Sequence, residues 1–202
     1  MSRLALILAL ACCGRTEPVR GRYGGARNPG DGGTVCASTC SAPPSVIAGT
    51  PFATVASGAP LHWLRCEGCV RVTLDPELGS QLGLTRFVVH AWDISLAGGL
   101  CLSPVELAAA DATELHRIHL VRGQANTLVS DEEGTLLRAV VGVGSSTVEQ
   151  TTLFGAALGL GTSADPGNSV MSASTTRTSP GPFDQTSLRA LYGNVPWCER
   201  SR

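Results

Sequence analysis

Two apolar patterns with different periods mark the start of the predicted globular region. Apolar and polar residues alternate from Cys69 to Leu74, which predicts a strand with one buried face. Apolar residues then recur every three to five positions from Leu82 to Leu96, as in a helix with one apolar face. We expect this face to centre on Phe87, Ala91 and Trp92, with Trp92 buried.

Three further strands are predicted after this helix. Short apolar stretches at Val105–Leu107 and Arg117–Val121 are expected to form two of them. The run Leu136–Val143 is apolar almost throughout, which is typical of a strand that is buried on both faces. The chain is therefore expected to contain a sheet preceded and followed by helices.

Capping signals place two helices near the C-terminus. Ser146 and Glu149 have the S-x-x-E spacing of a capping box, so a helix should begin there and cover residues 147–159, where glycines end it. Phe183 and Asp184 are expected to cap a last short helix, Gln185–Tyr192. The predicted fold class is α+β, a mixed twisted sheet with two long helices and a short C-terminal helix.

The N-terminus has the pattern of an export signal. Residues 1–3 form a short basic head, and residues 4–11 form an apolar run that is too short to cross a bilayer. Cys12 or Cys13 follows Leu-Ala, which resembles a bacterial lipobox, in which the signal is cleaved before a cysteine that is then lipidated. The alternative is an ordinary secretory signal with two incidental cysteines. Both readings predict export, either to the bacterial cell envelope on a lipid anchor or into the medium.

By composition, the rest of the chain divides into an expected tether, a domain and a tail. Residues 14–58 are rich in Gly, Pro, Ser and Thr and cannot bury enough apolar surface to fold alone, so we expect a flexible tether after the signal at 1–13. A domain is expected at 59–193 and a C-terminal tail at 194–202. The net charge of −1 gives no reason to expect a nucleic-acid partner, and a membrane is expected as a partner only through the N-terminal lipid.

Cysteines outside the signal are expected to form disulfides, because export leads to an oxidising compartment. Cys36 and Cys40 could close a small loop within the tether. Four further cysteines can form two bonds in three different pairings, which the sequence leaves open: Cys66, Cys69, Cys101 and Cys198.

The histidines do not form a recognisable ligand set. His116 and His119 would point to opposite faces of a strand, so they are not expected to share a metal ion. His90 is expected at or near the surface of the first helix. The fourth histidine, His62, lies before the first predicted strand.

Three motifs in order along the chain resemble the matrixin branch of the metzincin metallopeptidases. A P-L-x-W element begins at Pro60, G-A-A-L-G-L-G runs from Gly155 to Gly161 with S-V-M following at 169–171, and L-Y-G ends at Gly193. Matrixins carry HExxHxxGxxH on the corresponding helix, with three histidines that bind zinc and a glutamate that acts as general base. The ligand positions fall here on Thr152, Ala156 and Thr162, and the general-base position falls on Leu153.

The resemblance implies a matrixin-like domain without the zinc chemistry of its relatives. Ala and Leu offer no lone pair and a neutral Thr hydroxyl is a poor zinc ligand, so no cofactor is expected. The leading hypothesis is a pseudoprotease that binds a peptide or protein in the former substrate cleft, or that serves as a structural surface module. The alternatives are an active zinc endopeptidase with a rebuilt metal site and a disulfide-stabilised binding domain unrelated to proteases.

The resemblance also implies a position for Met171. In matrixins the methionine turn forms an apolar floor beneath the zinc ligands. With Leu153 and Ala156 in place of polar groups, we expect that floor to continue into the core, with Met171 near Ala156.

Overall fold

The computed structural model describes residues 52–64, 68–111, 113–123, 126–144 and 146–193. The predicted signal, most of the predicted tether and the C-terminal tail lie outside the described residues. The same holds for six of the eight cysteines, namely Cys12, Cys13, Cys36, Cys40, Cys66 and Cys198.

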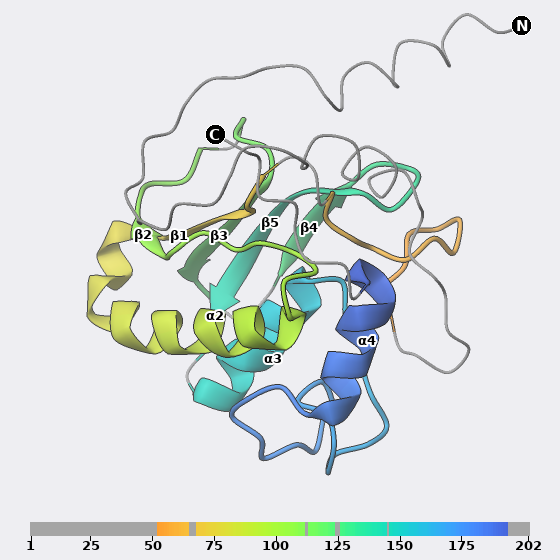
Figure 1. Cartoon of the computed structure of the whole chain (residues 1–202). Coiled ribbons are helices and arrows are strands. Elements are labelled where there is room, and N and C mark those ends of the chain that lie inside the picture. Colours follow the sequence, from red (N-terminus) through yellow and green to blue (C-terminus); the bar gives the residue numbers. More distant parts are fainter. Residues whose placement is uncertain (1–51, 65–67, 112, 124–125, 145, 194–202) are drawn as a thin grey trace, which may run out of the picture. The chain divides into compact units, whose positions relative to one another are not determined.

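The described part of the chain is a mixed α+β fold built on a five-stranded sheet (Figure 1). The strands are β1 (Arg71–Leu74), β2 (Glu106–Leu107), β3 (Arg117–Arg122), β4 (Thr127–Ser130) and β5 (Leu136–Val143). Their order is β2-β1-β3-β5-β4, and every neighbouring pair is parallel except β4 with β5, which is antiparallel. The predicted mixed sheet is therefore confirmed.

Three α-helices and one short 3-10 helix complete the described fold. They are η2 (Pro76–Gln81), α2 (Leu82–Leu96), α3 (Thr147–Ala157) and α4 (Pro182–Tyr192). Helices α2 and α3 lie together below the sheet in Figure 1, with α4 beside them. The predicted bounds of α2 and of the strand β5 are confirmed at both ends.

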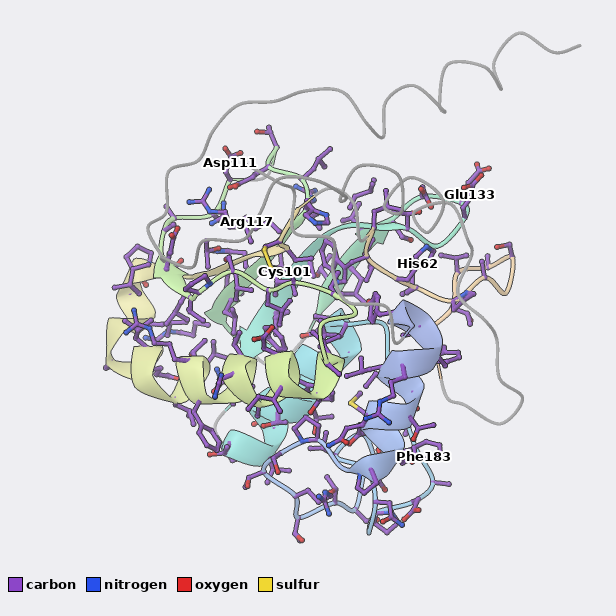
Figure 2. All side chains as sticks on the ribbon, in the orientation of Figure 1. His62, Cys101, Asp111, Arg117, Glu133 and Phe183 are labelled. Carbon is purple, nitrogen blue, oxygen red and sulfur yellow. A yellow bond between two sulfur atoms is a disulfide. The ribbon has the colours of Figure 1, made fainter. Side chains whose placement is uncertain are left out.

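The two faces of the sheet differ in polarity because alternate residues of a strand point to opposite sides. On one face, Val72, Ile118 and Val141 are fully buried in the same core as Trp92 and Phe154 of the helices. On the other face lie Thr73, Arg117 and His119, which are also buried. The segment between α2 and β3 passes on this second side, where Figure 2 labels Asp111 and Arg117.

The buried face of α2 differs from the prediction. Trp92 is buried as expected, but Phe87 is 54% exposed and Ala91 is only half-buried. The buried stripe instead runs through Thr85, Val88, Val89, Trp92, Ser95 and Leu96. The prediction was wrong because it counted Phe87 as an anchor, whereas the helical period that includes Trp92 passes through residues 85, 88 and 89.

Helix α3 ends earlier than the sequence predicts, and helix α4 begins earlier. Helix α3 stops at Ala157, two residues early, because Gly159 turns the chain with a φ of +89°. A Cβ at residue 159 would stand 2.1 Å from the carbonyl oxygen of Leu61, so only glycine fits. Helix α4 begins three residues early at Pro182, with Gly181 as its N-cap. Asp184 is thus the third residue of the helix and not its cap.

A disulfide in the structure excludes two of the three possible pairings of these cysteines. Cys69 and Cys101 form a disulfide, with their Cα atoms 4.4 Å apart. The adjoining residues Val70 and Leu102 form a parallel bridge, which brings the two cysteines together. The disulfide therefore joins the start of β1 to the segment that follows α2.

Candidate functional site

The candidate site is the face of α3 that carries three of the four motif positions. Ser146 begins the helix as predicted, because its hydroxyl accepts a hydrogen bond from the backbone N–H of Glu149. Thr152, Leu153 and Ala156 are all half-buried, as Glu149 is. These positions are spaced three and four residues apart, so they form one stripe along the helix.

The opposite side of α3 faces the core. Its fully buried residues include Phe154 and Thr151, whose backbone carbonyl accepts a hydrogen bond from the indole N–H of Trp92 at 3.1 Å. Gln150 donates from its amide to the Thr85 hydroxyl at 3.0 Å. These contacts fix α3 against α2 and leave the stripe of Thr152, Leu153 and Ala156 on the open side.

Thr152, at the first ligand position of the motif, holds the following loop. Its hydroxyl oxygen lies 3.0 Å from the carbonyl oxygens of Val148 and of Val170. The first contact stays within α3, and the second joins the helix to the residue before Met171. The side chain of Thr152 therefore forms a hydrogen-bonded link between the helix and the turn that carries Met171, a role that the sequence did not reveal.

The loop after α3 returns the chain beneath the helix. Ser163 and Ser172 form a parallel bridge, and the N–H of Ser163 donates to the carbonyl of Met171 at 3.1 Å. Within the loop, the carboxylate of Asp165 accepts from the N–H groups of Gly167 and Asn168. The ends of this loop are thus joined, which explains why Met171 lies near α3 although it follows the helix by fourteen residues.

Met171 is buried, with 6% of its surface exposed, as predicted. Its sulfur occupies the space beside Gly155, because a Cβ built at residue 155 would stand 2.6 Å from that sulfur and 2.6 Å from the ring of Trp92. Met171 thus packs against Gly155, the residue next to the predicted neighbour Ala156. Thr162, the third ligand position, is exposed.

A buried carboxylate fixes the methionine turn from the other side. Asp184 of α4 is 1% exposed and accepts hydrogen bonds from the Ser169 hydroxyl at 2.5 Å and the Val170 N–H at 2.8 Å. It also accepts from the N–H of its own N-cap, Gly181, at 2.7 Å. The Ser169 hydroxyl oxygen in turn accepts from the N–H of Met171. The sequence indicated Asp184 only as a helix cap, and Ser169, fifteen residues before it, gave no sign of this contact.

The edge strand β4 is connected to α3 by a side-chain hydrogen bond. The side-chain amide of Asn126, the residue before β4, donates to the Leu153 carbonyl at 2.6 Å. Because β4 is the last strand of the sheet, its outer side pairs with no strand of the described chain. The open stripe of α3 and the edge of the sheet therefore adjoin one another.

The motif positions carry little chemistry of their own. Leu153 and Ala156 have no polar side-chain atom, and the Thr152 hydroxyl shares its one proton between the carbonyls of Val148 and Val170. Among the described residues, no group of three or more His, Cys, Asp and Glu side chains is placed to hold a metal ion. The site as described can present apolar surface and backbone hydrogen-bonding groups to a partner.

The four histidines lie away from the candidate site. His62 contacts the carbonyl of Pro60 through Nδ1 at 2.9 Å, and His90 is exposed on α2. His116 packs edge-on against Trp63, with the ring centres 5.7 Å apart. His119 lies on the polar face of the sheet, on the side opposite to the helices.

Comparison with known proteins does not assign this chain to a family. No family model matches the sequence, and no curated protein matches it. None of the helices in the described ranges combines the length and apolar character that a membrane span requires.

Proposed function

We propose that this chain is a matrixin-like domain that has lost the zinc site and acts, after export, as a binding or structural module of the bacterial cell envelope. The observation that carries the proposal is the position of Met171 beneath α3. The helix, the glycine turn and the buried methionine follow one another as the resemblance implies, while the ligand positions hold Thr152, Ala156 and Thr162.

Other parts of the fold support the same proposal. The apolar strand β5 leads directly into α3, as the last strand of a metzincin leads into its active-site helix. Helix α4 ends at Tyr192 and Gly193, in the L-Y-G sequence that resembles the end of a matrixin domain. The hydroxyl of Tyr192 donates to the carbonyl of Leu158, just after α3, and accepts from the N–H of Trp63 in the P-L-x-W element. All three motifs thus meet at the end of α3.

The proposed binding surface combines the outer edge of β4 with Leu153 and Ala156 on α3. An edge strand can pair with an extended peptide through backbone hydrogen bonds, and neighbouring apolar side chains then select side chains of that peptide. We therefore propose an extended, apolar peptide segment as the partner.

Metal content tests the loss of the zinc site. The full-length protein, purified without a tag, should contain zinc at far less than one equivalent by mass spectrometry and should not cleave a quenched peptide library. Stoichiometric zinc together with peptide cleavage that a chelator abolishes would establish the alternative, an active peptidase with a non-standard metal site.

Variants on two helices test the binding surface. Leu153→Glu should abolish the capture of extended peptides from a display library, whereas Phe87→Glu, which changes an exposed apolar residue on α2, should leave capture unchanged. Equal binding by both variants would argue against the surface on α3 and β4.

Metabolic labelling with a fatty acid tests the proposed anchor. Loss of label in a Cys12→Ala or a Cys13→Ala variant would identify the lipidated residue. An unlabelled protein recovered from the medium would support the ordinary secretory signal.

A further inference from the structure

A buried polar cluster lies on the face of the sheet away from the helices and is centred on His119. His119 of β3 is 4% exposed, and its Nδ1 lies 2.8 Å from the Thr73 hydroxyl of β1 and 3.2 Å from a guanidinium nitrogen of Arg117. Its Nε2 is buried and has no hydrogen-bond partner among the residues that the structure describes. Thr73 and Arg117 are themselves buried.

The surrounding donors determine which nitrogen carries the proton. Arg117 has no acceptor, and its Nε donates to the Thr73 hydroxyl at 2.7 Å, so this hydroxyl is free to donate its own proton to His119. Nδ1 of His119 therefore accepts from both neighbours, and the neutral ring carries its proton on Nε2. A second proton would have to enter at Nδ1, between two groups that already donate there.

Arg117 also connects the sheet to the segment that covers it. One guanidinium nitrogen donates to the carbonyl of Ala109 at 2.8 Å, and another donates to the carboxylate of Glu114. Glu114 pairs with Arg71 of β1 as well. Displacement of Arg117 would therefore break its own hydrogen bonds to Ala109 and to Glu114 at the same time.

Charged side chains of the neighbouring strands, and of the segments that adjoin these strands, determine the electrostatics at His119. Arg117 is the nearest and repels a protonated ring, whereas the carboxylates of Asp75, after β1, and Glu114 attract it. On the next strand, β5, Arg138 lies opposite Arg117 in the register. Glu114 is shared between Arg71 and Arg117, so it does not compensate a third positive charge in full.

We propose that this cluster is a pH-sensitive latch, in which protonation of His119 displaces Arg117 and releases the residues around Ala109 and Glu114 from the polar face of the sheet. The release exposes Thr73, Arg117 and His119 below neutral pH while the core on the helical face stays intact. A domain exported from the cell meets such changes of pH directly.

The direction of the pKa shift agrees with this geometry. Burial, followed by repulsion from Arg117, lowers the pKa of His119 below its ordinary value of 6.5. Because the folded pKa is the lower one, the closed state gains its stability above pH 6.5 and loses it as the pH falls through the folded pKa. The population of the open state should grow by about tenfold per pH unit between these two values.

Hydrogen exchange of the full-length protein at pH 7.5, 6.5 and 5.5 tests the latch. After correction for intrinsic rates, peptides that carry residues 108–111 and 113–117 should exchange faster at lower pH by up to about tenfold per unit, while peptides of β5 should not. His119→Asn keeps an acceptor near the position of Nδ1 but does not titrate, so it should remove the pH dependence. His90→Asn, on the surface of α2, is the matched control and should retain it.

A second measurement covers the case in which His119→Asn does not fold. In the wild type, the ring protons of His119 should titrate by NMR below 6.5, and the amide signals of Glu114 and Leu115 should shift with the same midpoint. The proposal would be overturned by amide signals that do not shift as His119 titrates, or by hydrogen exchange that increases equally in β5.

Discussion

The sulfur of Met171 lies where a side chain of residue 155 would have to be. A Cβ at Gly155 would come within 2.6 Å of that sulfur and of the Trp92 ring, so three elements meet at one glycine of α3. Glycine inside a helix costs about 1 kcal/mol relative to alanine. Here the cost is offset because the missing side chain lets the methionine turn and α2 approach the backbone of α3.

Gly155→Ala should therefore destabilise the protein although alanine is the better helix former. We expect a loss of about 1–3 kcal/mol from overpacking, measured by chemical denaturation. Gly83→Ala in α2 is the matched control, because a Cβ there meets nothing within 4 Å. That substitution should be neutral or should stabilise the protein by up to about 1 kcal/mol. A stabilising Gly155→Ala would show that Met171 does not pack against the helix.

Met171→Ala tests the same contact from the other side. Truncation of a buried methionine leaves a cavity and typically costs about 2–5 kcal/mol, so the melting temperature should fall clearly. Thr162→Ala changes an exposed residue at the other end of the loop and should have little effect. Small, equal effects of both substitutions would mean that the methionine turn does not contribute to the core.

Helices and strands were predictable where the apolar pattern was long or where the capping residue lies next to the helix in the sequence. The helix Leu82–Leu96 and the strand Leu136–Val143 have the predicted bounds, and Ser146 caps α3 as the S-x-x-E spacing indicated. The strand β4 was missed because Thr127–Ser130 places its two apolar residues side by side between two turns. It therefore shows no alternation, unlike the equally short β1.

The contacts that fix the candidate site were not predictable, because they join residues distant in sequence. The carboxylate of Asp184 looks like a helix cap until the fold brings Ser169 to it. The Thr152 hydroxyl was considered only as a lost zinc ligand, whereas it bonds the carbonyl of Val170. The Cys69–Cys101 bond likewise depends on a bridge between β1 and the chain after α2, which no cysteine spacing specifies.

Asp184→Asn should destabilise the domain more than its small change in shape suggests. An amide offers one acceptor oxygen where the carboxylate accepts from three donors, so at least one buried donor loses its partner. We expect a loss of about 3 kcal/mol in denaturant titrations. Asp93→Asn, at an exposed position of α2, should change stability little. A loss of similar size in both variants would indicate that the buried hydrogen bonds of Asp184 carry no special weight.

The two remaining cysteines of the predicted set should form a second bond. With Cys69 paired to Cys101, only Cys66 and Cys198 are left, and both lie outside the described residues. Trp63 precedes Cys66 by three residues, and Tyr192 precedes Cys198 by six. Trp63 and Tyr192 are in contact, since the Trp63 N–H lies 3.3 Å from the Tyr192 hydroxyl. Segments of three and six residues can span about 10 and 20 Å, which is enough for the cysteines to meet.

Peptide mapping without reduction tests this pairing in protein recovered from an oxidising compartment. The expected product is a Cys66–Cys198 crosslinked peptide beside the Cys69–Cys101 one. Free thiols at both positions, or a crosslink to Cys36 or Cys40, would contradict the prediction.

Restoring the four motif residues should restore a metal site if α3 and its loop keep the matrixin arrangement. The variant carries Thr152→His, Leu153→Glu, Ala156→His and Thr162→His. The first and third positions are four residues apart on one stripe of α3, where two imidazoles can bind one zinc ion. The third imidazole depends on the turn at Gly159, which has to return residue 162, exposed in this structure, toward the same stripe.

Isothermal titration with zinc should therefore detect one site in the fourfold variant and much weaker binding in a control that lacks Thr162→His. The substitution at Thr152 also removes the hydroxyl contact to the Val170 carbonyl, so the variant should be less stable than the wild type before zinc is added and should regain stability with zinc. Equal affinity in the fourfold variant and the control would mean that residue 162 does not reach the helix. Without the third ligand, the loop after α3 would not have the geometry that the proposed matrixin-like fold requires.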